Sequence, residues 1–130
     1  MKWLIAALSI FILGTQLGMY HERTRYNMPQ SVEDGYKTDL NNARFDLEIE
    51  KQKLNILLCE SGCKHTGVWG DGGKSYGIAQ FQYKTFCDLK GEAGIPSLRW
   101  TNREDQIRLL DWALRHGYGK YWTCYTGGKL

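Results

Sequence analysis

Residues 57–86 read LLCESGCKHTGVWGDGGKSYGIAQFQYKTF, and the remainder of the 130-residue chain is organised around this stretch. Leu54, Leu57 and Leu58 recur at helical spacing, so we expect one face of a helix to enter a core. The same helix carries Glu60 to its C-terminal end. The pattern predicts a carboxyl group held at the edge of a core.

A glycine-rich loop follows this helix. Gly70, Gly72 and Gly73 do not extend a helix cheaply. We therefore expect the chain to turn back, and residues 75–82 to return as an extended or irregular wall of alternating polar and aromatic side chains. The position of Glu60 beside this wall makes it the candidate general acid.

The segments Glu60-Ser61 and Gly77-Ile78-Ala79-Gln80 resemble, in order and spacing, the lytic transglycosylases and goose-type lysozymes, over roughly residues 54–125. The resemblance implies a mostly α fold: a small lysozyme-like domain with a short irregular or β-hairpin loop region. The chain departs from the family late, where residues 117–125, GYGKYWTCY, replace the usual Ala-Tyr-Asn-Ala-Gly segment.

The resemblance implies cleavage of the peptidoglycan glycan strand, with Glu60 as general acid and base and with no cofactor or metal. Breaking a glycosidic bond requires protonation of the leaving oxygen. Asp71 is the acid nearest in the loop, but its Asp-Gly sequence favours an ordinary turn. The sequence does not decide between hydrolysis of the glycosidic bond and a cleavage that leaves an anhydro sugar. The alternatives are a non-catalytic peptidoglycan-binding or structural module, and an anchored adaptor.

The expected substrate-binding residues are Ser61, Ser75, Tyr76, Gln80, Trp122 and Tyr125. By the resemblance, Ser61 orients Glu60 and Gln80 binds a sugar; the alternatives are a helix-capping serine and one exposed face of a strand. The rings of Tyr76, Trp122 and Tyr125 offer flat apolar surfaces on which sugars stack.

Two further helices are expected after the loop. The first covers residues 83–90, with Phe86 and Leu89 inward. The second begins at a capping box formed by Thr101 and Glu104. Its buried residues are predicted to be Ile107, Leu110, Ala113 and Leu114.

The N-terminal third is predicted to tether this domain. Residues 3–20 carry no charge and are long enough for a membrane span. We expect residues 1–22 to be a signal anchor, with a cleaved signal peptide as the alternative, residues 23–52 a linker and amphipathic helical spacer, and residues 53–130 the catalytic domain. The predicted location is the cell envelope, outside the cytoplasm.

The spacer carries an apolar stripe at helical spacing: Leu40, Ala43, Leu47, Leu54 and Leu57. The favoured interpretation is that the stripe packs on its own domain, because it is short for a coiled coil. The alternative is weak self-association. The net charge of +3, without a basic helix or a nucleic-acid motif, suits an anionic wall polymer and argues against nucleic acid.

The four cysteines indicate disulfides if the domain lies outside the cytoplasm. Spacing does not settle which of the three pairings forms. Our preference is Cys59 with Cys124 and Cys63 with Cys87. A zinc site from Cys59, Cys63 and His65 is the less favoured alternative, because a second pair of ligands is lacking.

Overall fold

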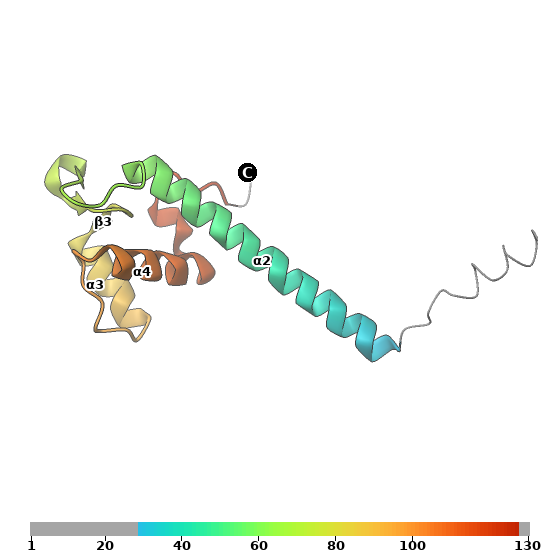
Figure 1. Cartoon of the computed structure of the whole chain (residues 1–130). Coiled ribbons are helices and arrows are strands. Elements are labelled where there is room, and N and C mark those ends of the chain that lie inside the picture. Colours follow the sequence, from blue (N-terminus) through green and yellow to red (C-terminus); the bar gives the residue numbers. More distant parts are fainter. Residues whose placement is uncertain (1–28, 128–130) are drawn as a thin grey trace, which may run out of the picture. The chain divides into compact units, whose positions relative to one another are not determined.

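The computed structural model describes residues 29–127 (Figure 1). The chain divides into two units, Met1–Asp39 and Leu40–Leu130, and the site and core described below belong to the second. The membrane span predicted for residues 3–20 lies outside the described residues. Within residues 29–127, no helix is long and apolar enough to cross a membrane.

The described part is mostly helical, with one small antiparallel sheet, as the sequence predicts. The elements in order are α2 (Gln30–Ser61), β1 (Trp69–Gly70), a 3₁₀ turn (Asp71–Gly73), β2 (Ser75–Tyr76), β3 (Phe81–Gln82), α3 (Tyr83–Glu92), α4 (Arg103–Arg115) and a second 3₁₀ turn (Tyr118–Tyr121). Strand β2 lies between β1 and β3, with Trp69 opposite Tyr76 and Ser75 opposite Gln82. The sheet is the expected hairpin region.

Helix α2 turns a different face to the core than the sequence predicts. Leu57 is buried, but Leu54 and Leu58 are 55% and 54% exposed. The buried positions are Ile49, Gln52, Ile56 and Leu57. The helix carries apolar residues on two opposite faces, so their spacing alone does not identify the inner one.

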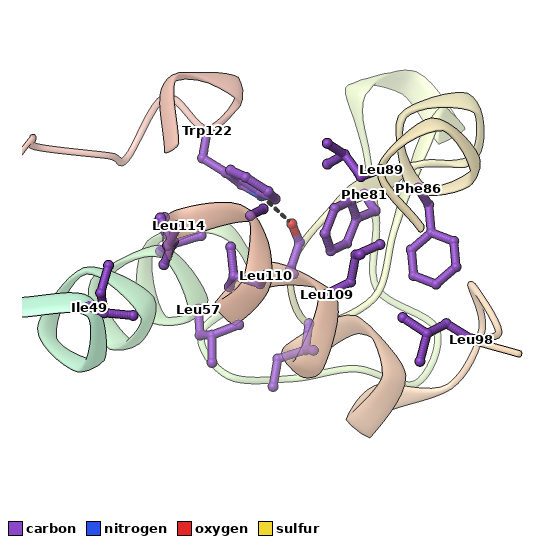
Figure 2. Close-up of a cluster of buried hydrophobic side chains, with 14 residues drawn as sticks. Ile49, Leu57, Phe81, Phe86, Leu89, Leu98, Leu109, Leu110, Leu114 and Trp122 are labelled. Atoms are coloured by element: carbon purple, nitrogen blue, oxygen red, sulfur yellow. Dashed lines mark hydrogen bonds between the residues drawn. The ribbon is translucent and has the colours of Figure 1, made fainter. Parts of the chain in front are cut away.

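The core is formed by α2, α3, α4 and the segment around Trp122, together with Ile78, Ala79, Phe81 and Leu98 from the segments between the helices (Figure 2). Phe86 and Leu89 of α3 are buried, as predicted. In α4, Leu110, Ala113 and Leu114 are buried as expected, together with Gln106 and Leu109. Ile107 is only partly buried.

The N-terminal cap of α4 is not the predicted box. The side chain of Asn102 accepts a hydrogen bond from the backbone N–H of Asp105 at 3.0 Å. The helix thus begins one residue later than a cap at Thr101 would place it, because Asn102 satisfies the free N–H group.

Two side chains fasten the loop of residues 77–80 to the rest of the domain. The amide of the fully buried Gln106 accepts from Ala79 N–H at 3.1 Å and donates to Tyr76 O at 3.0 Å. His65 Nδ1 accepts from Ile78 N–H at 3.1 Å, and its Nε2 lies 2.9 Å from Thr101 O. His65 is therefore a half-buried structural residue.

Gly77 tests how tightly this loop is held. Its φ of +81° is left-handed, and a Cβ there would lie 2.7 Å from the side chains of Gln106 and His65. Gly77→Ala is therefore expected to lower the free energy of unfolding by about 2–4 kcal/mol, measured by urea denaturation. Gly91→Ala is the control: it lies in α3 with open space around it, so it should be neutral or stabilising. Equal stability of the two variants would contradict this account.

Helices α2 and α4 are also joined by ion pairs. Lys53 Nζ lies 2.9 Å from Asp111 Oδ1, and Arg115 contacts Asp46 at 2.6 Å and Asp111 at 2.8 Å. Burial alone would raise the pKa of Asp111, but the hydrogen bonds from Lys53 and Arg115 outweigh it and lower that pKa. The Asp111 carboxyl is thus ionised near neutral pH.

Candidate active site

A polar cavity of about 310 Å³ lies beside the end of α2. Of the residues predicted for the site, it brings together Glu60, Ser75, Gln80 and Trp122. It is also lined by Asp71, Phe81, Gln82, Thr85, Tyr121 and Thr123. A second cavity, of about 420 Å³, shares Thr85 and Tyr121 with it, so the hollow continues along α3.

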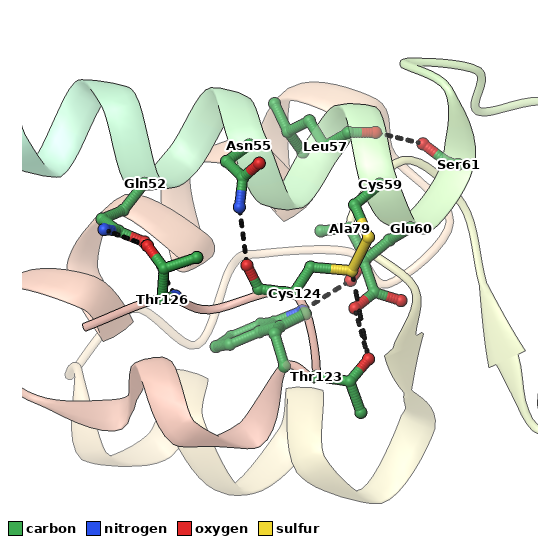
Figure 3. The surroundings of a disulfide bond; sticks show 11 residues. Gln52, Asn55, Leu57, Cys59, Glu60, Ser61, Ala79, Thr123, Cys124 and Thr126 are labelled. Atoms are coloured by element: carbon green, nitrogen blue, oxygen red, sulfur yellow. Dashed lines mark hydrogen bonds between the residues drawn. A yellow bond between two sulfur atoms is a disulfide. The ribbon is translucent and has the colours of Figure 1, made fainter. Parts of the chain in front are cut away.

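Glu60 is half-buried at the last turn of α2, where its carboxylate lines the cavity. The hydroxyl of Thr123 lies 3.4 Å from Glu60 Oε1 as a donor. Figure 3 shows this contact beside the disulfide that joins Cys59 to Cys124. The acid and its neighbour are each adjacent in sequence to one half of that disulfide.

The segment after Trp122 is fastened to α2 at several points (Figure 3). Asn55 Nδ2 donates to Cys124 O at 2.6 Å. The amide of buried Gln52 donates to Thr126 Oγ1 at 2.8 Å and accepts from Thr126 N–H at 3.2 Å. These bonds and the disulfide fix the position of Thr123 relative to Glu60.

The preferred pairing of Cys59 with Cys124 is confirmed, but the second predicted disulfide is wrong. Cys63 and Cys87 are both free. Cys63 lies just beyond the end of α2 in a left-handed conformation, with φ of 61°, and packs against the core, while Cys87 lies within α3. Cys59 is in a disulfide, so the alternative zinc site lacks one of its ligands.

Asp71 is the second acidic residue that lines the cavity. It lies in the 3₁₀ turn, as its Asp-Gly sequence suggests, but its side chain also lines the cavity. Ser75 Oγ donates to Asp71 Oδ2 at 2.5 Å. Hydrogen bonds from Ser75 and then from Gln82 lower the pKa of the Asp71 carboxyl, so it is a carboxylate at neutral pH.

Gln80 has a backbone φ of 49° and is anchored in the loop by its side chain. Its Nε2 donates to Gly77 O at 2.7 Å and to Val68 O at 3.3 Å. A Cβ on Gly70 would lie 2.2 Å from Gln80 Oε1. Glycine at position 70 therefore leaves the space that the Gln80 amide occupies in the cavity wall.

Three other predicted residues do not line this cavity. Ser61 Oγ donates to Leu57 O at 3.0 Å and to Ile78 O at 2.7 Å, so it ties the helix end to the loop. Tyr76 packs against Trp69, and the centroids of the two rings lie 4.7 Å apart. Tyr125 covers Gly119.

Trp122 lines the cavity but its ring belongs to the core. Its side chain is 6% exposed, and its Nε1 donates to Ala79 O at 2.7 Å. The neighbouring Tyr121, which the sequence analysis missed, is 56% exposed and lines both cavities. Tyr121, not Trp122, therefore presents an open aromatic ring there.

The sequence analysis also did not identify Thr123, Thr85 and Gln82 as residues of the site. Only Thr123 had a signal in the sequence, because the preferred pairing of Cys59 with Cys124 brings it next to Glu60. Among residues 29–127, no three His, Cys, Asp or Glu side chains are grouped so that they could hold a metal ion. Comparisons with protein-family models, curated proteins and solved structures gave no match to this chain.

Proposed function

We propose that this chain is a lysozyme-like enzyme that cleaves the glycan strand of peptidoglycan, with Glu60 as general acid and base. The observation that carries the proposal is that Glu60 stands at a helix end in a polar cavity with a second carboxylate, Asp71, in its wall. Most glycosidases cleave the glycosidic bond with a pair of carboxyl groups in one site.

The two acids differ in what holds them. Asp71 receives hydrogen bonds from Ser75 and Gln82, which favour its charged form. Within residues 29–127, the Glu60 carboxylate accepts one long side-chain hydrogen bond, from the Thr123 hydroxyl, so its oxygens are open to a substrate oxygen. We assign the proton transfer to Glu60 and the stabilisation of positive charge on the sugar ring to Asp71.

The remaining lining suits a sugar polymer. Gln80, Gln82, Thr85 and Thr123 supply amide and hydroxyl groups, which hydrogen-bond sugar hydroxyls and N-acetyl groups. The exposed ring of Tyr121 supplies an apolar face for stacking. Because Tyr121 also lines the second cavity, a bound strand could extend beyond the cleavage site along α3.

The disulfide supports a location outside the cytoplasm, where such bonds form and persist. We therefore propose that the enzyme acts in the cell envelope, held there by its N-terminal apolar segment. In this location the domain meets the peptidoglycan directly.

The proposal is tested by adding the 130-residue protein to a suspension of purified sacculi. The turbidity should fall as cut glycan strands dissolve. Protein that sediments with the sacculi without clearing them would contradict the proposed reaction and favour a binding module.

Asp71→Asn tests the role of the second carboxylate. The variant keeps the shape of the side chain but loses the charge, so we expect the rate of sacculus clearance to fall roughly 10- to 100-fold. Asp34→Asn, an exposed position on α2 that lines neither cavity, is the control and should keep the parent rate. An unchanged rate for Asp71→Asn would remove Asp71 from the mechanism.

A further inference from the structure

Helix α2 has a second apolar face that nothing covers among the described residues. Leu40, Leu47, Leu54 and Leu58 are each more than half exposed. The sequence favoured packing of a stripe made of Leu40, Ala43, Leu47, Leu54 and Leu57 on its own domain. That expectation is confirmed only at Leu57, and the rest of that stripe is exposed. We name Leu40, Leu47, Leu54 and Leu58 the outer stripe.

The outer stripe points away from the domain core. Ile49 and Ile56, which are buried, each follow a stripe leucine by two residues. Two residues turn an α-helix by about 200°, so the core face and the outer stripe lie on opposite sides of α2. A partner could cover the stripe without displacing the domain.

The spacing of the stripe is that of a coiled coil. Leu40, Leu47 and Leu54 repeat every seven residues, which places them at the a positions of a heptad. Ala43, Glu50 and Leu57 then occupy d positions, and Leu57 is buried in the domain core, so the seam ends before it. A seven-residue repeat favours a seam between helices, whereas packing within a globular domain follows the 3.6-residue period. Because the repeat covers only three leucines, the seam is short.

The charges beside the stripe identify the partner. In this register Asp39 and Asp46 take the g positions, and Arg44 and Lys51 take the e positions five residues further on. In a parallel pair of helices, each g residue faces the next e residue of the other helix. Asp39 would face Arg44. Asp46, which also binds Arg115 of its own domain at 2.6 Å, would face Lys51. Each pair has opposite charges.

An antiparallel pair would instead place e residues against e residues and g residues against g residues, so that like charges meet. Each copy of α2 thus carries acidic g residues and basic e residues, which pair with the opposite charges of a second, parallel copy. We propose that the outer stripe is the seam of a parallel homodimer of this chain. This inference does not depend on the proposed enzymatic function.

One residue limits the strength of the seam. Glu50, at a d position, would face Glu50 of the second copy across the dimer, so two like charges would meet. Lys53 Nζ lies 2.6 Å from Glu50 Oε1 and also binds Asp111, which partly compensates the Glu50 charge. The dimer is therefore expected to be reversible. Replacing Glu50 with Leu should tighten it.

The test is sedimentation equilibrium of the full 130-residue chain in detergent micelles. Leu47→Glu should raise the dimer dissociation constant at least 10-fold, and Glu50→Leu should lower it about 10-fold. Asn41→Glu is the control, because it adds the same charge one residue beyond Leu40, off the stripe, and should change the constant less than about twofold. Equal dissociation constants for Leu47→Glu and the parent, or a monomer at every concentration up to about 0.5 mM, would overturn the proposal.

Lys51→Glu tests the orientation through the sign of its effect. In a parallel dimer it creates a like-charge pair with Asp46 and weakens association. In an antiparallel dimer it removes a repulsion between e positions and tightens association. Tighter association of Lys51→Glu would therefore overturn the parallel arrangement.

Discussion

Replacing Glu60 with Gln is expected to lower the turnover number for peptidoglycan cleavage by roughly 10³-fold. The amide nearly preserves the shape of the side chain and its contact with Thr123, but it carries no proton that can be donated to a leaving oxygen. Binding of the glycan to the cavity walls should survive. The loss would thus appear in kcat rather than in KM.

The matched control is Glu104→Gln, an exposed position in the first turn of α4 outside the cavity of Glu60. Both variants are measured for clearance of sacculi and for co-sedimentation with sacculi. If Glu60→Gln retained a tenth or more of the parent rate, another group would have to supply the proton.

The second large effect concerns the disulfide. Cys59 and Cys124 are separated by 65 residues, so the bond closes most of the domain into one loop. Its removal by Cys59→Ser with Cys124→Ser is expected to lower the free energy of unfolding by about 4 kcal/mol. Urea unfolding of the parent with and without a reducing agent gives an independent measure of the same difference.

Cys87→Ser provides the control for this pair. Cys87 is free and only half-buried, so its replacement should cost less than about 1 kcal/mol. Equal stability of the double variant and the parent would show that the hydrogen bonds of Gln52 and Asn55 suffice to hold the C-terminal segment.

The disulfide is also expected to matter for the site. Cys59 precedes Glu60 and Cys124 follows Thr123, so the disulfide sets the distance between the acid and the Thr123 hydroxyl. A reduced protein that stays folded should therefore lose activity. Binding of the glycan strand in the second cavity, which is lined by Thr85 of α3 and by Tyr121, should be less affected.

The sequence predicts the elements that depend on local rules. The helix over residues 83–90 is found as Tyr83–Glu92, with Phe86 and Leu89 inward as expected. Glu60, Ser75 and Gln80 do meet at one cavity, since a helix end and a returning hairpin bring them together. These features follow from apolar spacing and from glycines that force a turn.

The sequence does not show which of two similar side chains is buried when both are apolar or aromatic. Leu54 and Ile56 are equally apolar, and only the position of the rest of the domain decides that Ile56 is buried. Trp122 and Tyr121 are likewise adjacent aromatic residues. The hydrogen bond from Trp122 to Ala79 O decides which ring enters the core.

Buried polar residues were the other source of error. Gln106 and Gln52 look like surface residues of their helices, yet each satisfies backbone or side-chain groups of a distant segment. Such contacts join residues that are 27 and 74 positions apart in the sequence, and no local pattern predicts them. The same limit applies to Cys63 and Cys87, whose pairing depended on a distance that spacing does not give.

The most direct test of the central claim is mass spectrometry of the fragments that the protein releases from purified peptidoglycan, beside the Glu60→Gln variant. The account predicts that the parent alone releases disaccharide units with intact stem peptides, cut between sugars. Anhydro ends would identify a lytic transglycosylase and reducing ends a hydrolase. Identical fragments from both proteins, or fragments cut within the stem peptides, would contradict the assignment of Glu60 as the acid that cleaves the glycan strand.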